Sequence, residues 1–136
     1  MSHENIELVR RVYNAVAAGD AEAVLALYDP EAEFDFSRSP FGSVTSQTVY
    51  RGHEGLRCFF RERYEVWQEV EDGYEELIDA GDHVISAVTS RGRGRGSGVE
   101  VERTHYGVWS IDAGKVVRVE WFGTRAEALE AAGLRE

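Results

Sequence analysis

Residues 99–122 read VEVERTHYGVWSIDAGKVVRVEWF, and this stretch predicts two long β-strands folded back on each other. Both halves are rich in β-branched and aromatic residues, which favour strands. The residues Asp112-Ala113-Gly114 between them form a turn signal of the kind that closes hairpins. After the turn, Val117, Val119 and Trp121 alternate with Arg118, Glu120 and Phe122. A hairpin of this length buries one face only if other elements pack on it.

The first half of the chain supplies helices that can cover such a sheet. In residues 3–18 apolar side chains recur three and four positions apart, which predicts an amphipathic helix that ends at Gly19. Asp20 is placed to cap a second helix, which Pro30 stops. A third helix is predicted from residue 52 to about residue 70, and its buried stripe consists of Leu56, Phe59, Phe60, Val66, Trp67 and Val70.

The remaining segments predict short strands and loops. Strands are expected at residues 31–36, 73–80 and 83–90, and a final helix at residues 124–132 with Thr124 and Glu127 as its capping box. The stretch from Ser37 to Val49 predicts a loop that forms a pocket rim or lid, and the run RGRGRGSG at residues 91–98 predicts a flexible connection. Because the strands follow one another after the helices, the fold class is α+β, with residues 1–136 as one domain.

Composition narrows the classes of partner. The 136 residues carry a formal net charge of −10, which argues against nucleic acid or an anionic membrane as a partner. Cys58 is the one cysteine, so no intramolecular disulfide can form, and we expect a cytoplasmic protein. The first residues lack the apolar run of a signal peptide. Four scattered histidines show no metal-ligand spacing, so neither a metal nor a cofactor is predicted.

Three strings together resemble the SnoaL-like branch of the nuclear-transport-factor-2-like superfamily. They are ENIELVRRVYNAVAAGDAEAVLALYDPEAEF, YRGHEGLRCFFRE and GRGSGVEVE…W…GKVVRVEWFGTRAEALEAAGL. The resemblance implies a cone-shaped barrel, in which a strongly curved mixed or antiparallel sheet packs on three N-terminal helices and a short C-terminal helix. It also implies a pocket for a small apolar molecule and a homodimer formed through the outer sheet face. Because functions vary widely in this superfamily, the fold alone implies little about activity.

The ketosteroid isomerases of this superfamily use one tyrosine and two aspartates in the pocket. Counted from the shared GD and GKVV strings, their positions fall here on Val12, Phe36 and Tyr106. All three residues differ from the isomerase pattern, so the resemblance does not imply steroid isomerisation by that mechanism. Tyr106 nevertheless keeps a hydroxyl that could donate to a ligand oxygen.

Four residues are candidates for catalysis, each beside a structural alternative. Tyr106 is either an oxyanion donor or a core tyrosine with its hydroxyl at the rim. His105 is a natural general base, but two neighbours on a strand cannot both face inward, and the alternative is an interface residue. Asp35 lies beside the expected base position, where alternation favours the outer face unless a bulge re-aims it. His53 either contacts ligand at the pocket mouth or belongs to the helix-entry turn.

A second group of residues is expected to line the pocket. These side chains are mostly aromatic. For Phe60, Trp67 and Trp121 the alternative is ordinary core packing, and for Tyr13 it is a structural role. The predicted ligand-binding residues are Tyr13, Phe36, Tyr50, Phe60, Trp67, Val108, Val119 and Trp121.

Three functions remain open on the sequence. The first is a cofactor-free acid–base enzyme, of isomerase, cyclase or dehydratase type, acting on an apolar molecule that carries oxygen. The second is a ligand-binding or dimerisation accessory protein without turnover. The third is an interaction module, although no exposed apolar patch in the sequence singles it out.

Overall fold

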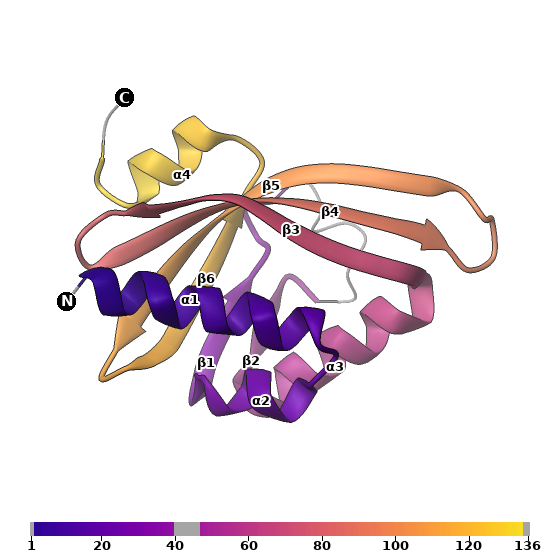
Figure 1. Ribbon diagram of the computed structural model, residues 1–136, viewed down its shortest axis with the longest axis horizontal. Coiled ribbons are helices and arrows are strands. Elements are labelled where there is room, and N and C mark those ends of the chain that lie inside the picture. The colour runs from indigo at the N-terminus through magenta and orange to yellow at the C-terminus, as the bar shows by residue number, and fades with distance from the viewer. Residues whose placement is uncertain (1, 40–46, 135–136) are drawn as a thin grey trace.

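The computed structural model describes residues 2–39 and 47–134, which form one curved sheet with helices on both faces (Figure 1). The helices are α1 (Ser2–Ala17), α2 (Ala21–Ala26), α3 (Gly52–Val66) and α4 (Arg125–Ala131). The strands are β1 (Tyr28–Asp35), β2 (Val49–Arg51), β3 (Trp67–Asp79), β4 (His83–Gly94), β5 (Glu100–Asp112) and β6 (Lys115–Phe122). Their order in the sheet is β2-β1-β6-β5-β4-β3, in which only β1 and β6 run parallel. This mixed sheet confirms the predicted fold class.

The predicted hairpin is present as β5 and β6. Asp112 pairs with Lys115, so the turn consists of Ala113 and Gly114, whose φ angles are +50° and +77°. Positive φ at both central residues is the geometry whose twist matches that of the flanking strands. A register shift after Ser110 then brings Val116, rather than Val117, into the core.

The two predicted helix caps at Asp20 and Thr124 are confirmed. Asp20 accepts a hydrogen bond from the Ala23 N–H at 3.1 Å, and Thr124 accepts one from the Glu127 N–H at 3.2 Å. Pro30 does not stop α2, however, because the helix has already ended at Ala26. The chain instead enters β1 at residue 28 and pairs with β6.

The predicted third helix is wrong in its last turn. The helix ends at Val66, and Trp67 and Val70 belong to β3, where the ladder with β4 satisfies the backbone. The arginine–glycine run is likewise strand up to Gly94, and not a loop throughout. The physical reason is pairing on both sides, because Arg91 and Arg93 pair with residues of β3 and of β5. A Cβ at Gly92 would lie 3.3 Å from the Trp67 ring. Glycine at this place makes room for the indole on the sheet.

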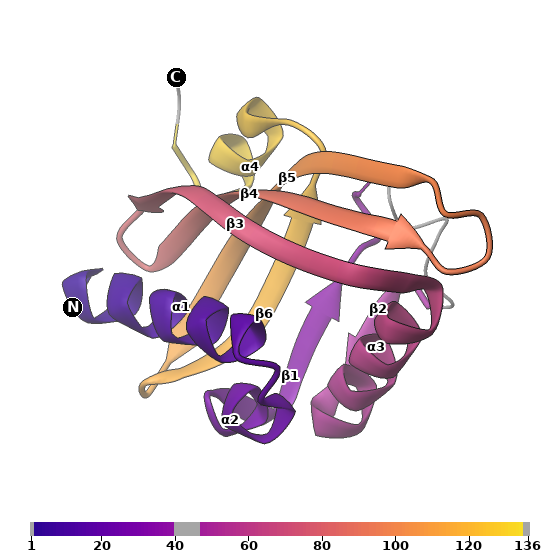
Figure 2. The same ribbon diagram turned by 45° about the vertical axis from the view of Figure 1, so that its right-hand side comes forward.

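The sheet separates two apolar clusters of unequal size. On its concave face, α1, α2 and α3 cover the larger core, which includes Val9, Val24, Leu56 and Trp109 (Figure 2). On the opposite face, α4 covers a smaller core around Phe122. Within the described residues, no helix is both long and apolar enough to cross a lipid bilayer.

Candidate functional site

A cavity of about 330 Å³ lies between the concave face of the sheet and the helices α1 and α3. This volume falls within the range of small-molecule pockets. Most of the wall is apolar and aromatic, and its rings belong to Tyr28, Phe34, Phe36, Phe59, Phe60, Trp67, Trp109 and Trp121. The side chains therefore leave a hollow with an aromatic lining rather than filling the interior.

Strand geometry decides which polar groups reach this cavity. Along β5, alternate residues Arg103 and His105 face it, as strand alternation requires. Along β3, the register with β4 shifts between Gln68 and Glu71, and Glu69 has a φ of +52°. This extra residue is a β-bulge, and it places Asp72 on the same side as Trp67, five positions earlier.

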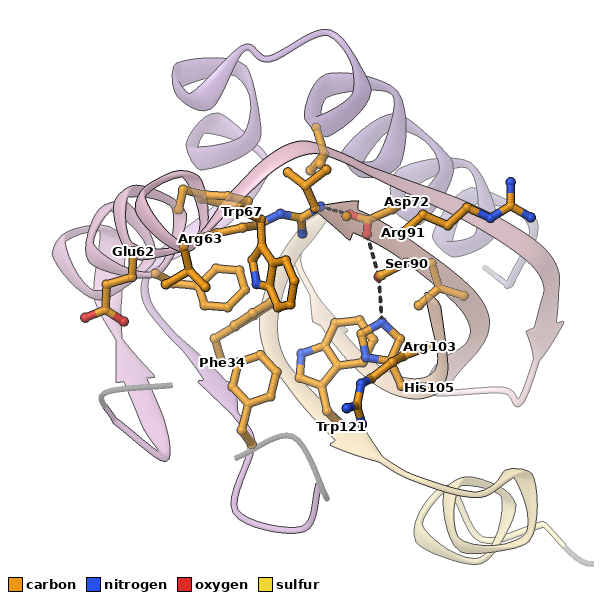
Figure 3. A pocket seen from close by; sticks show the side chains of 18 of the residues that line it. Phe34, Glu62, Arg63, Trp67, Asp72, Ser90, Arg91, Arg103, His105 and Trp121 are labelled. Carbon is orange, nitrogen blue, oxygen red and sulfur yellow. Dashed lines mark hydrogen bonds and ion pairs between the residues drawn. The ribbon is translucent and has the colours of Figure 1, made fainter. Parts of the chain in front are cut away.

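Four polar side chains in the cavity wall form a chain of contacts (Figure 3). Arg63 of α3 forms an ion pair with Asp72 of β3, with 2.8 Å between Nη2 and Oδ2. The Ser90 hydroxyl donates to Asp72 Oδ1 at 2.6 Å, and Ser90 Oγ lies 3.2 Å from His105 Nε2. Arg63 and Asp72 are only 15% and 10% exposed, so water screens their interaction little.

The direction of these hydrogen bonds sets the protonation of the imidazole. Because Ser90 uses its hydrogen toward the Asp72 carboxylate, its oxygen can only accept from His105 Nε2–H. The lone pair of the neutral ring then resides on Nδ1. Burial lowers the pKa of His105 to about 4, an effect that Asp72 opposes and Arg63 reinforces. The ring is therefore neutral at physiological pH.

Trp121 forms a platform beneath this imidazole. The two rings stack with their centroids 4.8 Å apart and their planes 23° from parallel. The indole nitrogen Nε1 is buried and has no hydrogen-bond partner among residues 2–39 and 47–134. In Figure 3 this nitrogen lies on the edge of the indole that faces Phe34.

Five residues predicted from the sequence line the cavity: Phe36, Phe60, Trp67, His105 and Trp121. Three others pack in the surrounding core without lining it. The Tyr13 hydroxyl donates to Ser86 at 3.0 Å, and burial raises its pKa.

Tyr50 and Val119 are fully buried, and the Tyr50 hydroxyl donates to Glu62 at 2.6 Å. These two side chains therefore belong to the core and not to the lining of the cavity.

The structure places Tyr106 and Val108 on the far side of the sheet, against the core beneath α4. This corrects the expectation that Tyr106 faces the concave side, and strand parity is the reason, because His105 occupies that side.

Asp35 is also on the outer face, where it accepts a hydrogen bond from Arg118 Nη2 at 2.7 Å. His53 Nε2 lies 3.0 Å from the backbone oxygen of Tyr28, which fits the structural role in the helix entry.

Sequence reasoning missed Arg63, Asp72 and Ser90. Arg63 looks like a solvent-facing helix residue, and Asp72 falls between two predicted elements. The position of Ser90 could have been predicted, because it is separated from Val84 and Val88 by even numbers of residues and so shares their strand face.

Within the part of the chain that the structure describes, no three His, Cys, Asp or Glu side chains lie close enough together to hold a metal ion.

Comparison with known proteins gives one family and many similar folds. The family model described as a SnoaL-like domain matches residues 9–119. A nuclear-transport-factor-2-like protein from Burkholderia thailandensis E264 is 29% identical, with 92% of this chain and 96% of that chain covered and a TM-score of 0.77. None of the curated proteins matches the chain.

Two further structures have the same fold at lower identity. TerC, co-crystallised with polyporic acid, is 22% identical, with 96% of this chain and 98% of that chain covered and a TM-score of 0.78. A SnoaL-like polyketide cyclase candidate from Jannaschia sp. CCS1 is 20% identical, with 96% and 91% covered and a TM-score of 0.74. At these identities the likeness concerns the fold alone.

Proposed function

This chain belongs to the SnoaL-like domain family, and from that premise we propose that it catalyses acid–base chemistry, without a cofactor, on a small apolar molecule that carries oxygen. The observation that carries the proposal is the polar chain Arg63–Asp72–Ser90–His105, which ends at a neutral imidazole inside an aromatic cavity. TerC supports the ligand class, because that neighbour was crystallised with polyporic acid.

In this proposal His105 is the general base. Its Nδ1 takes a proton from the carbon next to a ligand carbonyl, and the electrons of the broken C–H bond move into an enolate. The resulting imidazolium donates from Nε2 to Ser90, whose hydroxyl donates in turn to Asp72. The carboxylate thus stabilises the positive charge across the serine, in a site from which water is largely excluded.

Arg63 and Trp121 have supporting roles in the same scheme. Arg63 holds the Asp72 carboxylate in the orientation in which it accepts a hydrogen bond from Ser90. The Trp121 indole N–H is a donor that the described residues leave unused, and we assign it to the enolate oxygen. Returning the proton to a different atom of the enolate completes an isomerisation. Attack of the enolate carbon on a second carbonyl of the ligand forms a C–C bond and an alkoxide, and return of the proton from His105 to that alkoxide completes a cyclisation.

A hydrogen-exchange assay tests the proposal without knowledge of the natural product. Methyl naphthyl ketone is an aromatic probe of suitable shape, and proton abstraction in D₂O replaces its α-hydrogens by deuterium, which NMR detects. We expect the protein to accelerate this exchange and His105→Gln to abolish the acceleration. The matched control His53→Gln, outside the cavity, should keep it. Absence of exchange on a ketone that the protein binds would overturn the catalytic role.

Ligand binding without turnover is the second candidate, and a specific observation favours it. Val12 and Phe36, the positions of a catalytic tyrosine and base in the resembling isomerases, are apolar here and both line the cavity. In this case the protein binds the ketone but does not accelerate the exchange of its α-hydrogens for deuterium.

A further inference from the structure

The wall of the cavity differs in charge from the rest of the molecule. The charged side chains that face it are two arginines, Arg63 and Arg103, and two acids, Glu62 and Asp72. Arg91 also borders the cavity, but its guanidinium forms an ion pair with Glu102 and points away from the cavity in Figure 3. The four facing charges sum to zero, whereas the whole chain carries −10. The cavity is therefore much less acidic than the protein as a whole.

Both acids already have partners within the protein. Asp72 binds Arg63 through one oxygen and Ser90 through the other. Glu62 accepts hydrogen bonds from the Tyr50 hydroxyl at 2.6 Å and from Cys58 Sγ at 3.4 Å. In Figure 3 the Glu62 carboxylate points away from His105 and lies at the opposite end of the cavity. Neither acid therefore places an uncompensated negative charge beside the imidazole.

Arg103 is the cation placed next to the polar chain. It is paired across the β4–β5 ladder with Ser90, and it lies two residues before His105 on the same strand face. Two residues along a strand correspond to roughly 7 Å. Arg103 is exposed, whereas Trp109, farther along the same face, is only 2% exposed. The cavity-facing side of β5 therefore runs from a cationic, exposed end at Arg103, the mouth of the cavity, to an apolar, buried end at Trp109, its floor.

We infer that the ligand of this cavity is an amphipathic anion, with an apolar ring system on the aromatic floor and a carboxylate held by Arg103 at the mouth. A guanidinium offers two parallel N–H donors that match a carboxylate, and its charge remains at every physiological pH. The inference rests on the proposed function for the identity of the site, and it adds the charge and the orientation of the substrate.

Two probes of equal shape test this inference. Naphthoate and naphthamide share the ring system and differ in whether the polar group is an anion or neutral. Binding to the intact protein is measured by calorimetry and by the shift in unfolding temperature. We expect naphthoate to bind at least about tenfold more tightly, and added salt to reduce this preference.

Variants then locate the preference. Arg103→Gln should lower naphthoate affinity to the level of naphthamide and leave naphthamide binding unchanged. Arg61→Gln removes the same charge from the exposed side of α3 and should leave both affinities unchanged. Equal binding of the two probes by the wild-type protein, no binding of either, or equal effects of the two substitutions would overturn the inference.

The variant His105→Gln separates this inference from the proposed function. Suppose that this variant still prefers naphthoate, and that neither it nor the wild-type protein exchanges hydrogen on the ketone. The charge assignment then stands and the catalytic role fails. If the wild-type protein exchanges hydrogen but prefers naphthamide, the catalytic role stands and the charge assignment fails.

Discussion

The surroundings of His105 lower the pKa of its imidazole, and this shift affects how the free energy of unfolding depends on pH. Its pKa is about 4 in the folded protein, mainly because burial disfavours the charged ring, against 6.5 for an ordinary histidine. Between these values the unfolded chain binds a proton that the folded chain does not bind. Stability is therefore fully present above pH 6.5 and falls as the pH decreases toward 4, by roughly 3 kcal/mol at most.

The first prediction is that His105→Gln removes this contribution. Chemical unfolding at a series of pH values should show a shallower loss of free energy between pH 6.5 and 4 in the variant than in the wild-type protein. His3→Gln, on the exposed part of α1, serves as the matched control and should keep the wild-type slope. Identical slopes in wild-type protein and the His105 variant would contradict the assignment.

Asp35 belongs to the framework of the outer face, and the second prediction follows from that. Although burial opposes it, hydrogen bonds from Ser37 and Arg118 lower the pKa of the Asp35 carboxyl, which is 5% exposed. Asp35→Asn weakens these bonds, so we expect a loss of about 1–3 kcal/mol in the free energy of unfolding, tempered by the partial exposure of Arg118. Naphthoate affinity should not change.

The same substitution also tests the placement of Asp35. A variant of unchanged stability that no longer binds naphthoate would show that Asp35 acts in the site. Urea unfolding and calorimetry on one preparation separate the two results.

At the scale of the elements, β5 depends on a glycine that lets two tryptophans pack closely. A Cβ at Gly107 would lie 2.8 Å from Trp121 Cζ3 and 3.1 Å from both Ser86 Oγ and Trp109 Nε1. The third prediction is that Gly107→Ala costs about 1–3 kcal/mol in unfolding free energy, because these rings cannot all move aside. It should also weaken ligand binding by displacing the Trp121 platform.

Gly73 in β3 provides the matched control. It is exposed, with no atom within 4 Å of its would-be Cβ, and its φ is not positive. Gly73→Ala should therefore be neutral or slightly stabilising. If both alanine variants unfold at the same denaturant concentration, the close approach at Gly107 has no energetic weight.

The elements that sequence predicted well are those whose signals are local. The turn at Ala113 and Gly114 and the caps at Asp20 and Thr124 depend on residues a few positions apart. The boundary between α3 and β3 could not be predicted in the same way. Trp67 and Val70 continue the helical spacing of apolar residues, and only pairing with β4, distant in sequence, makes them strand.

The candidate site was predictable only in part, for a related reason. The aromatic lining follows from apolar residues on predicted strands and helices. Choosing between His105 and Tyr106 requires the parity of β5 relative to the helices, which sequence alone leaves open. Asp72 reaches the cavity through the bulge at Glu69, and no local signal in QEVED marks that extra residue.

For the whole molecule, we propose that two copies pair through the outer face of the sheet, as the family resemblance implies. This face is polar where β3, β4 and β5 are uncovered: Thr89 lies within hydrogen-bond distance of Glu75, at 3.0 Å, and of Thr104, at 3.1 Å, and Arg91 pairs with Glu102. An interface of this composition depends on polar contacts more than on apolar burial.

The fourth prediction therefore concerns mass and salt. Sedimentation equilibrium at low salt should give twice the chain mass of 15.3 kDa, and high salt should move the mass toward that of one chain. A single-chain mass at every protein concentration in low salt would contradict pairing. Naphthoate affinity should be equal in both states, because the cavity opens on the concave side.

The bulge at Glu69 has a consequence for how members of such a family diverge. Every residue between the bulge and the next irregularity of β3 owes its inward or outward direction to one inserted amino acid. Deletion of that amino acid would turn Asp72 from the pocket toward solvent and its neighbours in the strand from solvent toward the pocket. No residue would have to be substituted for this exchange. Ligand preference in relatives of this protein can therefore change through a one-residue gap, which position-by-position identity would score as almost nothing.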